Sequence, residues 1–290
     1  MTMHRVARAL LCLGAVRAFA PLAGVTVNRV PSGEPLDLGK AMADSSTPEL
    51  CVLGTYAADF NAIEYAQKLK HYWPALQQKG LARCLLVLNA SPKACEALAT
   101  ALSLPPEIEV CSDPTGAAGR AYGVGTGWRP DDDSMSPYIK LLGMLVGLGA
   151  GGTLPAVITG YFGNPYGEAG WIESALRQGA AAGRWPGGLV VRGAPTEGDG
   201  ETYAFEALPL VGNWGRRPLE LATLRLQNMV GLSLARWGEL KPDDKFIDGS
   251  GVLTQLGGCV LLDASGGVAY EWKDNGICAT ADFETLVARL

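Results

Sequence analysis

The chain has 290 residues, of which 48% are hydrophobic and 18% charged, and its formal net charge is −5. This composition excludes an intrinsically disordered protein and is sufficient for a large core. The acidic balance argues against nucleic acid as the main partner. Its 7 cysteines never occur in C-x-x-C spacing and it has only 2 histidines, so we expect neither a zinc nor an iron–sulfur site, and no motif indicates another cofactor.

The N-terminus differs from the rest of the chain, because no carboxylate occurs before Glu34. The stretch ARALLCLGAV is typical of a signal peptide, and Val16-Arg17-Ala18 at its end is typical of a cleavage site. The next segment, FAPLAGVTVNRV, is typical of a transit peptide, and VRAFAP resembles the cleavage motif of bipartite presequences in algae with secondary plastids. We therefore assign residues 1–40 to a signal plus transit peptide outside the fold, with an ordinary secretory signal as the alternative.

Three nearly continuous apolar runs follow, and they predict buried strands over residues 49–56, 82–90 and 107–114. Helical patterns lie between and after them, over residues 60–79, 91–102 and 117–122. Gly80 is a natural helix C-cap, and Ser91 followed by Pro92 is a typical helix start. This alternation predicts a parallel α/β sheet.

The C-terminal part continues with a hairpin and a helix. GGCVLLDASGGVAYEW (257–272) predicts two strands around a turn, and TADFETLVARL (280–290) predicts a closing helix capped by Thr280 or Asp282. Parallel βαβ units, a hairpin and a last helix are the layout of the thioredoxin fold. We expect residues 41–127 and 251–290 to form this domain, and residues 128–250 to form a long, mostly helical insertion.

One stretch of the insertion, Leu141–Phe162, contains 22 residues without a charge. Its length suits a membrane span, but 6 glycines and Pro155 make it a poor single helix. We expect two short helices hinged around Gly149–Pro155, which cover the sheet or lie peripherally against a membrane or a protein partner. A true span is the alternative.

Three segments resemble the peroxiredoxins, the alkyl hydroperoxide reductase and thiol-specific antioxidant family. VLGTYAADFNAIEYAQKL resembles the family's strand–loop–helix, whose usual pattern ends D-F-T-x-x-C, and CSDPTGAAGRAYGV resembles its D-P-x-G-x-x-x-x-x-Y-G-V segment. The hairpin GGCVLLDASGGVAYEW resembles that of a peroxiredoxin-like branch in cyanobacteria and plastids. The resemblance implies an α/β protein with a thioredoxin-like (peroxiredoxin-like) central sheet and a long helical insertion.

The same resemblance implies that the catalytic positions are substituted. Asn61 stands where the family has its threonine, Glu64 where it has the peroxide-attacking cysteine, and Gly257 where it has its arginine. The chemistry requires a thiolate and hydrogen-bond donors that hold the peroxide, and a carboxylate cannot replace the thiolate. Glu64 is then a negative charge that favours a helix start, or an acid/base group.

Two other cysteines are candidate redox thiols. Cys259 opens the hairpin beside Gly257, and Cys278 lies in the turn-like DNGICATAD, where we expect it to be exposed. A packing role is the alternative for both. Without a cationic neighbour, their pKa is expected near ~8.5.

Two functions remain open. The first is a plastid (chloroplast) antioxidant or thiol-redox protein without the family's peroxidase activity; if it is an enzyme, it is a thiol-dependent oxidoreductase with thioredoxin as a partner. The second is a non-catalytic scaffold or accessory subunit that binds a thylakoid or photosynthetic protein complex through the insertion. Either is expected in the stroma or at the stromal face of the thylakoid.

Overall fold

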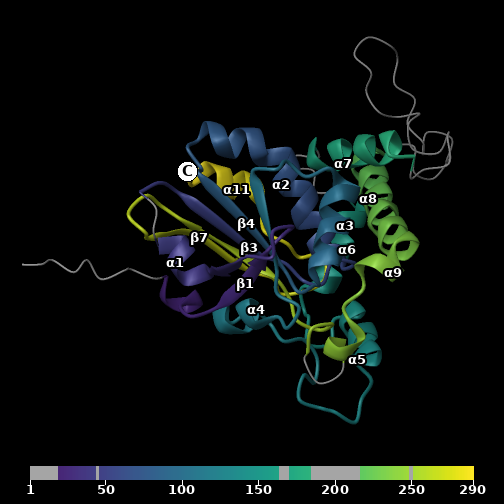
Figure 1. The fold of residues 1–290 in the computed structure, drawn as a ribbon. Helices are drawn as coiled ribbons and strands as arrows, with labels where there is room; N and C mark the ends of the chain where they lie inside the picture. Colours follow the sequence, from purple (N-terminus) through teal and green to yellow (C-terminus); the bar gives the residue numbers. More distant parts are fainter. Residues whose placement is uncertain (1–18, 44–45, 163–169, 184–215, 248–250) are drawn as a thin grey trace, which may run out of the picture.

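The computed structural model describes residues 19–43, 46–162, 170–183, 216–247 and 251–290 (Figure 1). These residues build a mixed, seven-stranded sheet of order β2-β1-β5-β4-β3-β6-β7. Its parallel centre consists of β3 (Glu49–Leu53), β4 (Arg83–Leu88) and β5 (Ile108–Ser112). The antiparallel hairpin of β6 (Gly258–Leu262) and β7 (Val268–Lys273) extends the sheet beyond β3.

The helices between the parallel strands follow the local signals of the sequence. Helix α2 (Phe60–Gln78) connects β3 with β4, and α3 (Pro92–Leu102) connects β4 with β5. Ser91 caps α3, because its Oγ accepts a hydrogen bond from the Ala94 N–H at 3.3 Å. After β5 comes the short helix α4 (Ala117–Tyr122).

The chain closes with α11 (Phe283–Ala288), whose cap is Asp282, one of the two predicted residues. The Asp282 carboxylate accepts hydrogen bonds from the N–H groups of Glu284 and Thr285. The βαβ units, the hairpin and this helix confirm the predicted thioredoxin-like layout.

Helices cover both faces of the sheet, and the side chains of β3 alternate between them. Leu50 and Val52 belong to the core beneath α2, α3 and α11, whereas Cys51 and Leu53 belong to a second core on the opposite face. That second core is covered by η1 (Ala20–Leu22), α1 (Leu38–Ala43) and α4 (Figure 1). Burial on both sides explains why the strands are continuously apolar.

The placement of residues 1–40 outside the fold is wrong for the described part of that segment. Strands β1 (Thr26–Arg29) and β2 (Pro35–Asp37) form an antiparallel pair, and β1 pairs with β5 at the edge of the sheet. Strands of four and three residues, each with one buried apolar side chain, leave little periodic signal. The targeting function of the segment stays a prediction.

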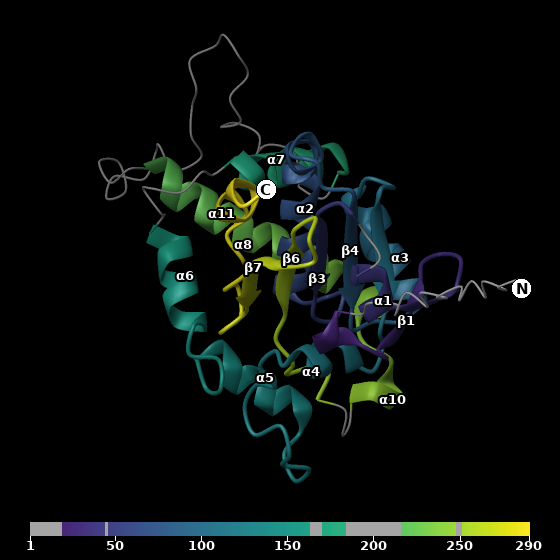
Figure 2. The same cartoon turned by 90° about the vertical axis from the view of Figure 1, so that its left-hand side faces the viewer.

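The described part of the insertion is helical, as predicted. It contains α5 (Pro137–Leu145), α6 (Thr153–Phe162), α7 (Gly170–Ala181), α8 (Arg216–Ala235), α9 (Trp237–Leu240) and α10 (Asp244–Ile247). Helices α7 and α8 pack against α2, and α6 packs against α8 (Figure 2).

The uncharged stretch 141–162 forms two short helices separated at residues 146–152, which confirms the predicted interruption. Among the described residues, no helix combines the length and the apolar character that a membrane crossing requires.

Candidate functional site at the start of α2

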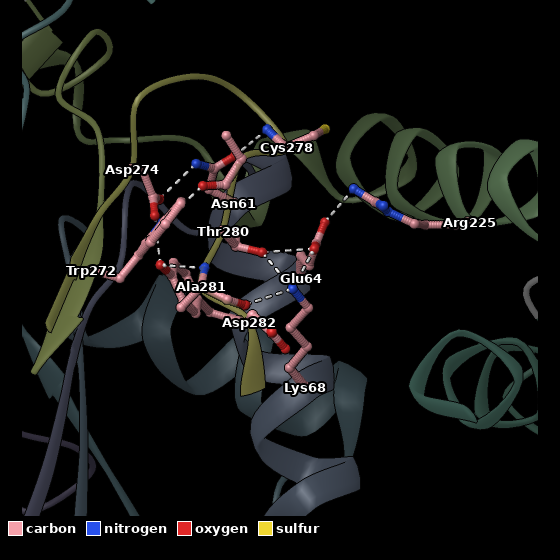
Figure 3. Close-up of polar contacts among 12 residues, drawn as sticks. Asn61, Glu64, Lys68, Arg225, Trp272, Asp274, Cys278, Thr280, Ala281 and Asp282 are labelled. Carbon is pink, nitrogen blue, oxygen red and sulfur yellow. Dashed lines mark hydrogen bonds and ion pairs between the residues drawn. The ribbon is translucent and has the colours of Figure 1, made fainter. Parts of the chain in front are cut away.

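The candidate site lies where α2 begins, beneath the segment that follows β7 (Figure 3). Asp59 is the extended residue before the helix, and Asn61, Glu64 and Lys68 then recur at helical spacing along one side of α2. All four are buried. Polar side chains are costly to bury without partners, so their contacts define the site.

Glu64 is the centre of a buried ion cluster. One carboxylate oxygen, Oε2, accepts a hydrogen bond from Arg225 of α8 at 2.6 Å. The other, Oε1, pairs with Lys68 Nζ at 2.9 Å and accepts a hydrogen bond from the Thr280 hydroxyl at 2.7 Å. The carboxylate therefore joins the start of α2 to the insertion and to the C-terminal segment.

The two cations of this cluster share further contacts. Lys68 Nζ also donates to Thr280 Oγ1 at 2.8 Å and to the Ala281 carbonyl at 2.9 Å. Lys68 and Arg225 both lie over the ring of Trp171 on α7, at 5.2 and 5.4 Å from its centroid. Cation–π contacts add to the Coulombic stabilisation of such a cluster.

Burial alone raises the pKa of the Glu64 carboxyl, but the charges of Arg225 and Lys68 and the hydrogen bonds from Thr280 and Lys68 outweigh it. The net result is a lowered pKa. Glu64 is therefore ionised at neutral pH and is not suited to serve as a general acid or base.

A second polar group next to this cluster centres on Asp274, which follows β7. Its Oδ1 accepts from the Tyr65 hydroxyl at 2.6 Å, and its Oδ2 accepts from Asn61 Nδ2 at 2.8 Å. Asn61 Oδ1 accepts from the backbone N–H of Cys278 at 2.6 Å, and Tyr65 Oη accepts from the Ala281 N–H at 3.1 Å. These bonds fix residues 274–281 over the start of α2.

The carboxyls beside Glu64 differ from it in their protonation. Burial raises the pKa of Asp274 to about 7 and that of Asp59 to about 6. Neither carboxyl forms an ion pair shorter than 4 Å within the described residues, which explains why burial dominates here and not at Glu64.

Gly257 lies beside Asp274 and has no room for a side chain. We call the region around Asn61, Glu64, Gly257 and Asp274, where α2 begins, the corner. A Cβ at this position would lie 2.6 Å from the Leu53 carbonyl oxygen and 2.9 Å from Asp274 Oδ2. An arginine could not be accommodated there in this structure. The guanidinium at this corner comes instead from Arg225.

Cys278 lies within this corner, but the expectation that it is exposed is wrong. The residue is only 8% exposed, and its backbone has a positive φ of 62°. Burial raises the pKa of its thiol to about 12, although the neighbouring Arg225 charge acts in the opposite direction. The predicted value near ~8.5 for a thiol without a cationic neighbour is therefore also wrong.

Cys259 is fully buried within β6, where its register partners are Val52 on β3 and Trp272 on β7. Burial raises its pKa well above the ordinary value. The remaining described cysteines, Cys51, Cys84, Cys95 and Cys111, are likewise buried free thiols whose pKa is raised by desolvation.

The structure thus brings together Asn61, Glu64, Gly257 and Cys278, and it places Cys259 inside the sheet. The site also contains Arg225, Asp274 and Lys68, which were not predicted from the sequence. Lys68 follows Glu64 at i+4, a spacing that predicts an ion pair on a helix. Nothing in the sequence relates Arg225 to Glu64, because 161 residues separate them.

Comparison with known proteins gives one family. Residues 68–276, more than half of the chain, match the model of the AhpC/TSA antioxidant enzymes. This range includes Arg225, Gly257 and Asp274, and it begins after Glu64. No curated protein and no solved structure matches the chain. From the family match and the thioredoxin-like sheet, the chain belongs to the AhpC/TSA antioxidant enzyme family.

Proposed function

We propose that this member of the AhpC/TSA family is a peroxiredoxin-like plastid protein that lacks the family's peroxidase activity and has Cys278 as its redox thiol. The observation that carries the proposal is the ion cluster of Glu64 with Arg225 and Lys68 at the start of α2. A carboxylate fills the position between the two cations. The charges that would stabilise a thiolate there are neutralised by Glu64.

Cys278 is the described thiol that lies beside the Arg225 guanidinium. With a pKa of about 12, its thiolate fraction at pH 7 is on the order of 10⁻⁵, so direct attack on peroxide is slow. Reaction of this thiol then requires local opening of residues 274–281, and we expect slow thiol–disulfide exchange instead of rapid peroxide turnover.

The second candidate function is the non-catalytic scaffold. It is favoured because the buried charged groups at the start of α2 hold the insertion in place. Arg225 and Trp171 belong to the insertion, and their contacts with Glu64 and Lys68 fasten it to α2. In this view the corner is a structural joint, and the insertion binds a thylakoid or photosynthetic protein complex. Co-fractionation with membranes tests that partner.

Peroxide consumption by the full chain tests the main proposal. Hydrogen peroxide is supplied with thioredoxin and its reductase, and the wild type is compared with Cys278→Ser and Cys259→Ser. We expect no turnover above the enzyme-free background in any of them. In parallel, labelling of the native protein with a thiol reagent is expected to modify Cys278 slowly and to leave Cys259 unmodified.

The Glu64→Cys variant provides a positive control for the corner. Its thiol would lie beside Arg225 and Lys68, so we expect a lowered pKa, faster labelling at neutral pH, and oxidation by peroxide to a sulfenic acid with release of water. Glu64→Ser is the matched control without sulfur, and circular dichroism verifies that both variants are folded, because each removes the carboxylate from the ion cluster. Rapid peroxide turnover by the wild type, abolished by Cys278→Ser, would show that the proposed loss of peroxidase activity is wrong.

Plastid targeting is supported by the acid-free N-terminus and the VRAFAP junction. Because β1 and β2 pair within the sheet, cleavage is expected only before them, so that the rest of the segment stays in the mature protein. A fluorescent protein carrying residues 1–40 is expected to enter the plastid of an alga with a secondary plastid. The same fusion with Phe19→Ala is expected not to enter the plastid, because an aromatic residue opens the transit part in such presequences. Secretion of the first fusion would instead support an ordinary secretory signal.

A further inference from the structure

Most of the large hydrophobic side chains that are exposed in the described residues lie on the helices α5 and α6 and the loop between them. Of the 10 large hydrophobic side chains exposed in the described residues, 8 lie between Tyr138 and Ile158. We name their exposed side chains the α5–α6 surface. In Figure 2 these two helices lie along one border of the molecule, outside the sheet and its covering helices.

The apolar rows of α5 and α6 approach each other at the loop between the two helices. Ile139, Leu142 and Val146 recur at helical spacing along α5 and its C-cap, and Leu154 and Ile158 do so on α6. The two rows meet at Gly147, where a Cβ would lie 3.8 Å from Leu154 Cδ1.

The base of this surface is firmly packed. On the inner side of α5, Met144 is buried and Gly143 lies directly against the Trp128 ring. The start of α6 is held by two hydrogen bonds, from the Gly152 N–H to the Asn275 carbonyl at 2.8 Å and from the Ile277 N–H to Thr153 Oγ1 at 3.0 Å. The exposed side chains are therefore presented by an ordered scaffold.

The area of the surface is sufficient for most of one side of a dimer interface. The 8 side chains are between 41% and 63% exposed. Apart from Tyr138 they are aliphatic and smaller than the roughly 150–250 Å² of an aromatic side chain, so together they present on the order of 500 Å² of apolar area. This lies near the upper end of the roughly 300–600 Å² of the largest patch on a typical monomer, and it is more than half of the roughly 800 Å² that each partner buries in a standard interface.

The distribution of charge distinguishes between two partners of this surface, an anionic bilayer and a second copy of the chain. No charged residue occurs from Leu141 to Phe162, and Lys140 is buried, with its Nζ donating to the Pro130 carbonyl at 3.3 Å. The nearest exposed charges along the chain before α5 are the carboxylates of Asp131 and Asp133, and the exposed Arg129 that precedes them is paired with Asp132 at 2.6 Å. Anionic bilayers attract helices with exposed lysine and arginine, so this border disfavours them. An uncharged surface can meet its own copy about a twofold axis without like-charge repulsion.

We propose that the α5–α6 surface is the interface of a homodimer, in which two copies of the chain bury the same side chains against each other. Tyr138 and the two apolar rows form its centre, and the acidic turn at residues 131–133 lies at its rim. The inference is independent of the thiol chemistry, because the exposed side chains of this surface are not among the contacts of Glu64, Asp274 or Cys278.

The proposal is tested by sedimentation equilibrium and light scattering of the full chain at about 50 μM. This concentration saturates most standard-size interfaces. We expect a dimer for the wild type and at least a tenfold weaker association for Leu142→Glu, whose leucine is 58% exposed. The matched control is Val268→Glu on β7, where the valine is 52% exposed, and this variant is expected to remain a dimer. Circular dichroism verifies that each variant is folded.

Three results would overturn the proposal. The first is a wild type that remains monomeric at this concentration. The second is a dimer that persists in both Leu142→Glu and Ile158→Glu, because another face then forms the contact. The third is flotation of the wild type with zwitterionic or anionic vesicles that Leu142→Glu abolishes, since the occupant is then a membrane.

Discussion

The carboxylate of Glu64 and the guanidinium of Arg225 meet at 2.6 Å, although 161 residues separate them in the chain. Glu64 lies near the start of α2 and Arg225 lies on α8, so this contact fastens the insertion to the thioredoxin-like domain. It also occupies the corner where the family resemblance places a thiolate. A single ion pair therefore bears on both the architecture and the chemistry of the protein.

Neutralising Glu64 is expected to destabilise the protein strongly. In Glu64→Gln, Arg225 and Lys68 remain largely buried without their counter-ion, and breaking a buried pair in this way costs about 3–5 kcal/mol. Urea unfolding measures the loss. The control is Asp244→Asn, which removes an exposed partner of Lys241 and is expected to leave the unfolding midpoint nearly unchanged. Equal midpoints for wild type and Glu64→Gln would contradict a structural role for the cluster.

Gly257 is expected to tolerate no side chain. Its Cβ would lie 2.6 Å from the Leu53 carbonyl oxygen, so Gly257→Ala must displace β3 or the segment before β6. We expect a loss of more than about 2 kcal/mol in the free energy of unfolding. Gly231→Ala on α8 is the matched control; nothing lies within 4 Å of that Cβ, and alanine favours a helix by about 1 kcal/mol. A neutral Gly257→Ala would show that the corner is loosely packed.

The stability of the protein is expected to fall as pH rises through the titration of Asp274. Burial raises its pKa to about 7, whereas an unfolded aspartate has a value of about 3.9. Between these values the folded state holds a proton that the unfolded state has lost, so the contribution is complete below about pH 4 and lost above about pH 7. Asp59, raised to about 6, acts in the same direction.

Urea titrations at pH 5 and pH 8 isolate the contribution of Asp274. The decrease in unfolding free energy between the two is expected to be larger for the wild type than for Asp274→Asn by on the order of 2 kcal/mol. Glu64 does not obscure this window, because its lowered pKa confines its titration to more acidic pH. Identical decreases in both proteins would mean that Asp274 is ionised throughout.

Deletion of residues 1–40 is expected to prevent stable folding. This deletion removes β1 and β2 and the buried side chains of Leu22, Val27, Leu36 and Leu38. Burial of such side chains contributes about 1.5–3 kcal/mol each, and their sum is comparable to the roughly 5–15 kcal/mol stability of a whole domain. It also exposes β5 as a new sheet edge.

Deletion of residues 1–18, which the sequence assigns to a signal peptide, is the matched control and is expected to yield folded protein. Thermal unfolding of both truncated chains is the measurement, and only the chain that lacks residues 1–18 is expected to show a cooperative transition. A cooperative transition after deletion of residues 1–40 would show that β1 and β2 are dispensable.

The strands and helices of the thioredoxin-like domain could be predicted from the sequence because their signals are local. Leu50 to Leu53 are buried on both faces of the sheet, so the strand reads as one apolar run, and Ser91 and Pro92 mark a helix start by themselves. Strands β1 and β2 escaped prediction, since they are too short for a periodic signal and β1 joins the sheet by pairing with β5, more than 80 positions away.

For the site, too, one part could be predicted from the sequence and another part could not. The sequence, through its resemblance to the family's strand–loop–helix and hairpin segments, determined which residues occupy the corner, namely Asn61, Glu64 and Gly257. Only the tertiary structure decided what surrounds them: the Arg225 ion pair, the hydrogen bonds of Asp274 and the burial of Cys278. Ionisation and reactivity depend on desolvation and on charges within a few ångströms, and chain order does not encode either when the partners lie on different elements.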